Sequence, residues 1–435
     1  MKKLMILVLL LGLLIVPGIG VNFAQDDCDD EIGCVVLAED DPVVVGYLLA
    51  LSGPVSFLGE DTKGSIEIVY EERGGELLGR ELELVEADGT CSAEGGQSAA
   101  QQLTSDDLLI GIIGTTCSGE STGAIPIISD AGLTMISASA TSPFLTDDDV
   151  DNGGIYEPGF FRTAQNDLFQ GRLAAEFAYN ELGLRRLATL HDGDAYTDGL
   201  QGAMANAFAE LGGEIVFQGA INKGDEDMTA VLTEVASAEP DVFYFPIFQP
   251  EADFIVAQSG GIDGMEDITL FAADGLFVDA FPQAAGENIA GMYLSSPYVT
   301  GEEYDALLQS WADVVGGTPP SAFHAHAYDA TNILLNAIEA VAVEMDDGSV
   351  SIGRQALRDE VASLTDYDGL TGTLSCGPTG DCATGEALAV YQIADEDSWP
   401  PELVFIPTGG GDDMDMDEDM DMDMDEDDSE EDSDD

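Results

Sequence analysis

The sequence is poor in positive charge. Of its 435 residues only 12 are Lys or Arg, against 86 Asp or Glu, which gives a formal net charge of −74. Nucleic acids and anionic membrane surfaces bind to basic faces, so this charge excludes both as partners. The apolar content of 45% is ordinary for a globular protein, which excludes general disorder and leaves room for two domains.

Histidine is also scarce, with three residues at positions 191, 324 and 326. His324 and His326 would point to opposite sides of a strand, or roughly 200° apart on a helix, which disfavours a shared metal ion. The chain contains no phosphate loop of the G-x-x-x-x-G-K type, so nucleotide chemistry is unsupported. We therefore expect neither a metal nor a cofactor.

The first 24 residues have the pattern of a secretory signal peptide. Lys2 and Lys3 precede an unbroken apolar run over residues 4–16, and a cleavage site is expected after Ala24. This run is too short to span a bilayer, and no later stretch is expected to do so. Cys28 lacks the apolar and small residues that precede a lipid-modified cysteine. The sequence predicts a secreted protein, periplasmic or at the cell surface.

Six cysteines in a secreted chain suggest disulfides. In two pairs of cysteines five residues separate the partners, and the two cysteines that are left are expected to form the third pair. The expected pairs are Cys28 with Cys34, Cys376 with Cys382, and Cys91 with Cys117. A zinc site is the alternative, but it would need tighter ligand spacing.

Apolar, β-branched runs alternate with segments of helical spacing along the body of the chain. The expected strands are 43–49, 82–85, 109–113, 134–137, 186–191, 214–218, 241–247 and 268–273. The expected helices are 62–73, 95–105, 121–131, 169–182, 199–211, 228–238 and 251–259. A polar stretch at 147–154 separates two series, so the order predicts an α/β protein with two doubly wound, Rossmann-like lobes. Ligands of such sheets bind beyond the carboxyl ends of the strands.

The C-terminal segment has a different composition. From Asp412 to Asp435 there are 17 acidic residues and no basic one. Such a segment cannot bury enough apolar surface to fold, so residues 408–435 are expected to form a disordered acidic tail. The alternation of Asp and Met lacks the central glycine of a calcium loop, which leaves loose cation condensation as the alternative.

One motif favours an enzyme. The segment 119–123 (GESTG) fits the pattern of a nucleophile elbow around Ser121, and Asp274 and His324 follow in the order of a hydrolase triad. However, such a serine lies on the sharp turn directly after its strand, whereas Ser121 falls several residues later, within the first helical turn. Close helix packing through small residues accounts for the motif equally well. A serine hydrolase is therefore the alternative function.

Small polar residues after the strands favour binding without chemistry. Residues 114–118 and 138–143 follow two strands, and their hydroxyls and helix N–H groups could hold a carboxylate. In the second lobe Tyr196, Phe248 and Asp274 each follow a strand. The acid could pair with an ammonium group while the aromatic rings cover an apolar side chain. The alternative is that each residue caps the next helix.

Several motifs together resemble the leucine/isoleucine/valine-binding proteins of ABC transporters. They are 51–54 (LSGP) followed by 58–59 (LG), 113–118 (IGTTCS), 137–143 (SASATSP), 191–196 (HDGDAY) and 327–330 (AYDA). The resemblance extends over residues 43–407. It implies a type I periplasmic-binding fold, in which two lobes joined by three hinge crossings trap a ligand and catalyse no reaction.

The resemblance also implies the division of the chain. The crossings are expected near Arg162, Ser296 and Gly372. The expected segments are an acidic N-terminal segment at 25–41, lobe 1 at 42–163 plus 297–371, and lobe 2 at 164–296 plus 372–407. A monomer that delivers its ligand to a membrane permease is expected.

Site residues are carried over by their position in these motifs. Ser118 and Thr141 resemble the residues that hold the α-carboxylate of the ligand, and Ser139 offers its carbonyl group to the ammonium. Asp274 resembles the acidic partner of the ammonium, and Tyr196 a tyrosine of the cleft. The side-chain pocket is expected to be lined by Leu58, Thr116, Cys117, Ala140, Phe248 and Phe323.

Three departures leave the ligand open. Leu58 and Phe248 stand where these proteins usually have tyrosines, and Asp274 stands where they have glutamate. Branched-chain amino acids, other small amino acids, amides and urea-like solutes are all candidates. A sensory domain with the same fold is a further alternative, although such domains continue into a membrane segment. The high negative charge would suit a saline habitat.

Overall fold

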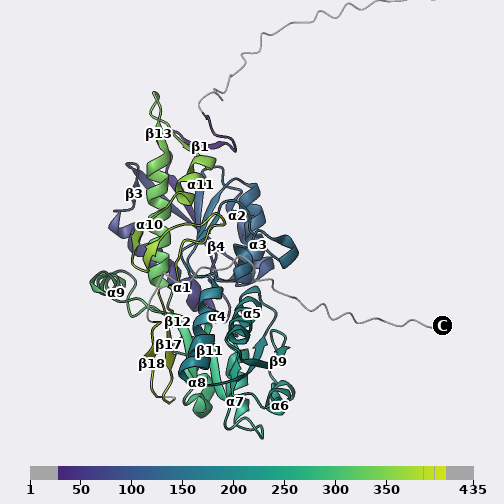
Figure 1. Cartoon of the computed structure of the whole chain (residues 1–435). Coiled ribbons are helices and arrows are strands. Elements are labelled where there is room, and N and C mark those ends of the chain that lie inside the picture. Colours follow the sequence, from purple (N-terminus) through teal and green to yellow (C-terminus); the bar gives the residue numbers. More distant parts are fainter. Residues whose placement is uncertain (1–27, 386, 396, 408–435) are drawn as a thin grey trace, which may run out of the picture.

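The computed structural model describes residues 28–385, 387–395 and 397–407. Figure 1 shows two α/β lobes stacked one above the other, which confirms the expected fold class. The expected signal peptide at 1–24 and acidic tail at 408–435 lie outside the described residues. Within the described part, no helix is both long enough and apolar enough to cross a membrane.

Lobe 1 is built on a six-stranded sheet. Its order is β3 (Glu76–Leu77), β4 (Arg80–Asp88), β2 (Val43–Leu49), β5 (Leu109–Gly114), β6 (Thr134–Ser137) and β7 (Phe160–Arg162). All neighbours run parallel except β3 and β4. Every residue of β2 and β5 is buried, because a parallel sheet is covered by helices on both faces.

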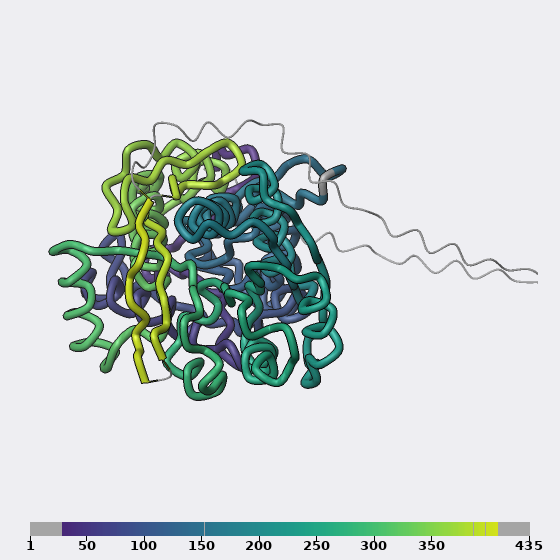
Figure 2. The backbone as a smooth tube through the Cα atoms, turned by 60° about the horizontal axis from the view of Figure 1, so that its bottom comes forward, coloured from purple at the N-terminus to yellow at the C-terminus, as the bar shows by residue number. Residues whose placement is uncertain are grey.

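Lobe 2 is built on a seven-stranded sheet. Its order is β18 (Glu402–Phe405), β17 (Leu388–Gln392), β12 (Tyr293–Pro297), β11 (Thr269–Ala273), β10 (Val242–Tyr244), β8 (Arg186–His191) and β9 (Glu214–Ala220). The strands from β12 to β9 are parallel, and β17 and β18 add an antiparallel edge. This edge appears in Figure 2 as two adjacent yellow segments.

The helices cover these sheets. In lobe 1 they are α1 (Ser56–Glu72), α2 (Ala93–Leu103), α3 (Ser118–Asp130), α9 (Glu302–Val314), α10 (His324–Val341) and α11 (Arg354–Ala362). In lobe 2 they are α4 (Asp167–Glu176), which continues as a π-helix (Phe177–Glu181), α5 (Ala195–Glu210), α6 (Thr229–Ser237), α7 (Glu251–Ser259) and α8 (Phe281–Ala285). Several short 3₁₀ turns, such as Pro143–Leu145, complete the loops.

Two of the departures from the expected strands matter for the path of the chain. The strand expected at 241–247 is shorter, because Pro246 has no N–H group to donate to a sheet. The short strand β7 (Phe160–Arg162) was not expected. It joins the edge of the first sheet immediately before the chain crosses to α4.

The third crossing lies later than expected. Gly372 belongs to β16 (Gly372–Leu374), which pairs with β15 (Tyr367–Gly369). Asp381 then forms a bridge to Arg162, and Cys382 packs in the lobe 1 core. The chain rejoins the second sheet only at Leu388, so the expected boundary at Gly372 is too early.

The N-terminal segment is part of lobe 1 rather than a separate acidic stretch. β1 (Cys34–Leu37) pairs with β14 (Val350–Gly353), which also pairs with β13 (Ala342–Glu344). Val35 and Leu37 are buried in the lobe 1 core. The described part of the expected acidic segment at 25–41 therefore packs on lobe 1 through these two alternating apolar side chains.

Candidate functional site

The polar loops of lobe 1 lie at the carboxyl edge of its sheet. Ser118 is the first residue of α3, and its Oγ accepts a hydrogen bond from the backbone N–H of Ser142 at 3.1 Å. The hydroxyl of Ser139 donates to the carbonyl oxygen of Thr116 at 2.9 Å. These bonds join the two polar loops that follow β5 and β6. The hydroxyl proton of Ser118 remains available to an acceptor.

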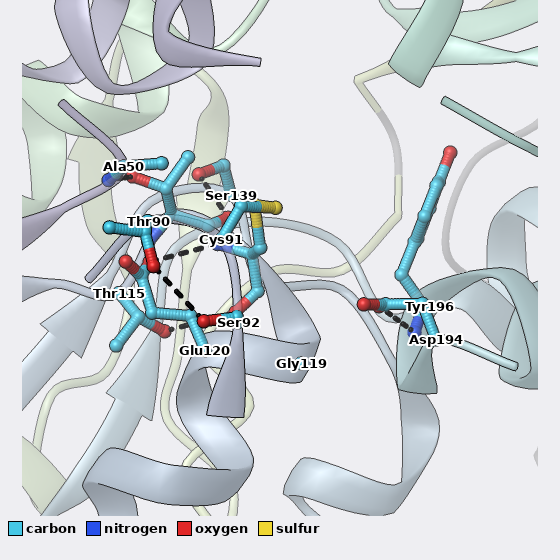
Figure 3. Close-up of a disulfide and its surroundings, with 12 residues drawn as sticks. Ala50, Thr90, Cys91, Ser92, Thr115, Gly119, Glu120, Ser139, Asp194 and Tyr196 are labelled. Carbon is cyan, nitrogen blue, oxygen red and sulfur yellow. Dashed lines mark hydrogen bonds between the residues drawn. A yellow bond between two sulfur atoms is a disulfide. The ribbon is translucent and has the colours of Figure 1, made fainter. Parts of the chain in front are cut away.

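A disulfide holds the start of α3 in place. Cys117 is the N-cap residue of α3 and is bonded to Cys91, as shown in Figure 3. The other two disulfides join Cys28 to Cys34 and Cys376 to Cys382, so all three expected pairs are confirmed. Disulfides are characteristic of an oxidising, extracytoplasmic compartment.

A buried carboxyl group lies beneath the same turn. Glu120 accepts hydrogen bonds from the backbone N–H groups of Thr116 at 2.8 Å and Cys117 at 3.3 Å. Burial raises the pKa of Glu120 to about 8. At neutral pH this side chain is therefore largely uncharged, so it does not oppose an anionic ligand at the start of the helix.

Lobe 2 contributes an acid and two aromatic rings. Asp274 follows β11, is 4% exposed, and its Oδ1 accepts hydrogen bonds from Gln170 and, at 3.2 Å, from the hydroxyl of Tyr196. Burial raises the pKa of Asp274 to about 6, although these hydrogen bonds act to lower it. The rings of Tyr196 and Phe248 lie 5.0 Å apart.

A second buried acid lies close to Asp274. Asp167, the first residue of α4, is fully buried, and its backbone N–H donates to the carbonyl of Thr141 at 3.0 Å. Burial, and then the charge of Asp274, raise the pKa of Asp167 well above its usual value. The Thr141 hydroxyl lies close enough to this carboxyl group to lower its pKa, and among the described residues neither side chain has another hydrogen-bond partner.

The apolar members of the expected site come together from both lobes. One continuous cluster of buried side chains contains Leu58, Cys117 and Phe323 of lobe 1 together with Tyr196 and Phe248 of lobe 2. The lobes are therefore in contact at this point. Thr116 and Ala140 are also buried, but they do not belong to this cluster. Thr116 Oγ1 accepts a hydrogen bond from the backbone N–H of Ala50 at 3.0 Å, and Ala140 packs in a separate cluster of lobe 1.

Arg162 supports the loop that carries Thr141. Its side chain is fully buried and donates to the carbonyl oxygens of Ala140 at 3.1 Å and Ser142 at 2.8 Å. It also forms an ion pair with Asp381. One guanidinium group therefore fixes the residues on both sides of Thr141.

The structure does not assemble the hydrolase triad. Ser121 lies inside α3, where its hydroxyl bonds to Thr115 and to the carbonyl of Cys117 at 3.1 Å. The ring of His324 bonds to the Tyr304 hydroxyl at 2.8 Å and to a backbone carbonyl, while Asp274 faces Tyr196. Each of the three residues thus has other partners, because the elbow pattern came from helix packing.

Sequence reasoning missed Asp167, Gln170 and the supporting role of Arg162. The rule that polar residues after strands form sites would have found Asp167, had the strand Phe160–Arg162 been recognised. Within the described residues, no group of three or more His, Cys, Asp or Glu side chains has the arrangement of a metal site.

Two α/β lobes with polar groups on their facing edges are the arrangement of a protein that binds a small molecule between its lobes. The chain belongs to the periplasmic binding protein family, which matches residues 42–397. This confirms the resemblance seen in the motifs, and members of this family are binding proteins rather than enzymes.

Individual relatives agree with this assignment. The chain is 26% identical to the Leu/Ile/Val-binding protein BraC3 of Rhizobium johnstonii over 352 residues, covering 80% of this chain and 91% of that protein. The crystal structure of a leucine-binding protein, LivK, from Thermotoga maritima is 25% identical with a TM-score of 0.71, covering 83% of this chain and 98% of that one. A solute-binding protein from R. palustris in complex with benzoate shares the fold at 21% identity and a TM-score of 0.68, covering 83% and 95% of the two chains.

Proposed function

We propose that this protein is the solute-capturing component of an ABC transporter and that it carries a small, zwitterionic amino acid to a membrane permease. The family, its leucine-binding and Leu/Ile/Val-binding relatives, and the position of the site between two lobes support the transport role. The ligand class is supported by the chemistry of the two facing edges.

One observation carries the ligand class: buried polar groups with unmet hydrogen-bonding capacity converge between the lobes. Among the described residues these are the Thr141 hydroxyl and both oxygens of Asp167, next to Asp274. Buried polar groups are normally hydrogen-bonded, so such a set is typical of a site that a ligand completes. Two acids from one lobe suit an ammonium group, and neutral hydroxyls from the other suit a carboxylate.

The residues have distinct roles in this proposal. Ser118 and Thr141 donate to the ligand carboxylate at the start of α3, and the carbonyl of Ser139 and the carboxyl of Asp274 accept from its ammonium group. Tyr196 orients Asp274. An apolar side chain of the ligand is covered by the buried residues Leu58, Thr116, Cys117, Ala140, Phe248 and Phe323.

Benzoate-like ligands are less well matched by this site. Benzoate has a carboxylate but no ammonium group, so it would leave two buried acids without a cationic partner. The pKa of about 6 at Asp274 means that this acid is mostly ionised at neutral pH. An anion without an ammonium group would meet that charge directly.

Calorimetry and thermal shift with leucine, isoleucine, valine, their amides, urea and benzoate test the proposal. We expect the amino acids to bind best. Asp274→Asn and Thr141→Val should weaken binding, by about 2–5 kcal/mol for the acid, because the cation would be left unpaired. Asp253→Asn is the matched control, since Asp253 is an acid of lobe 2 whose pKa burial also raises to about 6 but which lies on α7.

Two results would contradict the proposal. If Asp274→Asn and Thr141→Val bind the preferred ligand as tightly as the Asp253→Asn control, these residues do not form the site. If benzoate binds more tightly than every amino acid, the ligand class is wrong, although the transport role would stand.

A further inference from the structure

A second cavity lies between the lobes, lined by residues other than those of the proposed ligand site. Its volume is about 540 Å³. Lobe 1 supplies one wall from α9, from the loop before α10 and from His324, and lobe 2 supplies the other from the segments after β11 and between β17 and β18. A molecule seated in it would therefore contact both lobes.

Aromatic rings dominate the walls of this cavity. Phe277 lies 5.0 Å from the ring of Tyr391 and 5.4 Å from that of Trp399, which forms an aromatic cluster on the lobe 2 side. On the lobe 1 side Tyr304 stacks on His324 at 5.5 Å. Rings on opposite walls allow a small ligand to meet more than one aromatic face.

The charged groups around the cavity are acidic. Asp279 lines it and accepts a hydrogen bond from the indole N–H of Trp399 at 2.7 Å. Asp61 lies behind the opposite wall, 3.4 Å from the ring of His324. No Lys or Arg is among the residues that line the cavity in the described part of the chain.

We propose that this cavity binds an organic cation of the quaternary ammonium class. The electron-rich faces of aromatic rings attract weakly hydrated cations, because little hydration energy is lost when such a cation binds. A nearby carboxylate adds to that attraction. A metal ion would need several oxygen ligands, whereas Asp279 is the single carboxylate among the described residues that line the cavity. Choline and tetramethylammonium have the required chemistry.

Tryptophan fluorescence provides a direct test, because the chain contains only two tryptophans and one of them lines the cavity. Trp311 does not line the cavity but packs behind its wall, with its ring 5.9 Å from that of His324. The Trp311→Phe variant keeps an aromatic ring there and leaves Trp399 as the single reporter. Choline and tetramethylammonium chloride are titrated at constant ionic strength, with 3,3-dimethyl-1-butanol as the uncharged analogue of choline. Calorimetry of choline with the unmodified protein gives a second measurement should Trp311→Phe not fold.

We expect saturable binding of both cations, and binding of the uncharged analogue weaker by roughly tenfold or more. Asp279→Asn and Tyr304→Leu should each weaken cation binding. Tyr156→Leu is the control, since Tyr156 is a partly buried tyrosine on lobe 1 that does not line the cavity. An equal response to sodium chloride or to the uncharged analogue, or unchanged affinity in both cavity variants, would overturn the proposal.

Discussion

A Cβ atom on Gly119 would lie 2.5 Å from Oδ2 of Asp194. Gly119 is the second residue of α3 in lobe 1, and Asp194 is the N-cap of α5 in lobe 2. Figure 3 shows both residues beside the Cys91–Cys117 disulfide and Tyr196. The lobes therefore meet through a position that has no room for a side chain.

We expect Gly119→Ala to weaken ligand binding. The added methyl group opposes the contact between the lobes, and overpacking of this kind costs typically 1–3 kcal/mol. The ligand-free protein should lose little stability, because alanine favours the helix over glycine by about 1 kcal/mol. Calorimetry with the best-binding amino acid and small-angle scattering with and without it measure the effect.

A second substitution provides the control for this contact. Asp194→Ser shortens the opposing side chain but retains an N-cap residue for α5. We therefore expect the double variant Gly119→Ala/Asp194→Ser to recover part of the lost affinity. Wild-type affinity in Gly119→Ala alone would show that closure does not depend on this approach.

We expect Arg162→Lys to weaken ligand binding more than the same substitution at Arg358. A lysine has one ammonium group in place of a planar fork, so it cannot hold the carbonyls of Ala140 and Ser142 while also pairing with Asp381. Thr141 between them would lose its fixed orientation. Affinity and melting temperature are measured together to separate positioning from stability.

The matched control is Arg358→Lys. Arg358 is also buried and donates to backbone carbonyls, those of Ser129 at 2.9 Å and Leu133 at 3.1 Å, but these lie away from the site loops. Both variants should lose stability, and only Arg162→Lys should lose affinity. Equal affinities in the two variants would count against a positioning role.

We expect Glu120 to make the protein less stable as pH rises. Its pKa is about 8 in the folded protein because of burial, against 4.5 when unperturbed. A raised pKa means that the folded state holds the proton more tightly, so the stabilisation is complete below about 4.5 and is lost as pH rises toward 8. Urea denaturation at about pH 5 and about pH 8 measures it.

Glu120→Gln tests the assignment. Glutamine keeps an oxygen that can accept from the N–H groups of Thr116 and Cys117, but it does not titrate. The variant should therefore lose less stability than the wild type between these two pH values. Parallel curves for the two proteins would assign the pH dependence to other groups.

We expect salt to stabilise the protein. Its net charge of −74 destabilises the folded state, because the negative charges repel one another. Ion pairs such as Lys63 with Glu86, at 2.8 Å, are partly exposed and contribute little to stability. The screening length falls from about 10 Å at 0.1 M to about 3 Å at 1 M. The melting temperature should rise over this range of sodium chloride. An unchanged melting temperature would mean that the carboxylates are far enough apart for their repulsion to be screened already at 0.1 M salt.

The strands with unbroken apolar runs were predictable from the sequence. β2, β6 and β8 have the expected bounds, because a buried parallel strand needs apolar side chains on both faces and polar residues at its ends. The short edge strands β17 and β18 were not expected. β18 is largely exposed, a pattern that local composition does not distinguish from a loop. β17 is buried over residues 388–391, so its apolar run was a signal that the sequence-based prediction missed.

The site was only partly predictable. Ser118, Thr141 and Asp274 follow strands, and the topology of parallel sheets brings such residues to one edge. Asp167 was missed because the three-residue strand before it, Phe160–Arg162, was not recognised in the sequence. Its carboxyl group lies near Asp274, more than a hundred residues later in the sequence.

The sequence by itself determined the class of fold, the pairing of six cysteines and the polar loops, because each depends on spacing along the chain. Only the tertiary structure decided that Gly119 meets Asp194, that Arg162 holds the Thr141 loop, and that aromatic rings from both lobes enclose a second cavity. These relationships depend on how two separately patterned lobes are placed against each other. Local spacing carries no information about that placement, since it results from packing between distant segments.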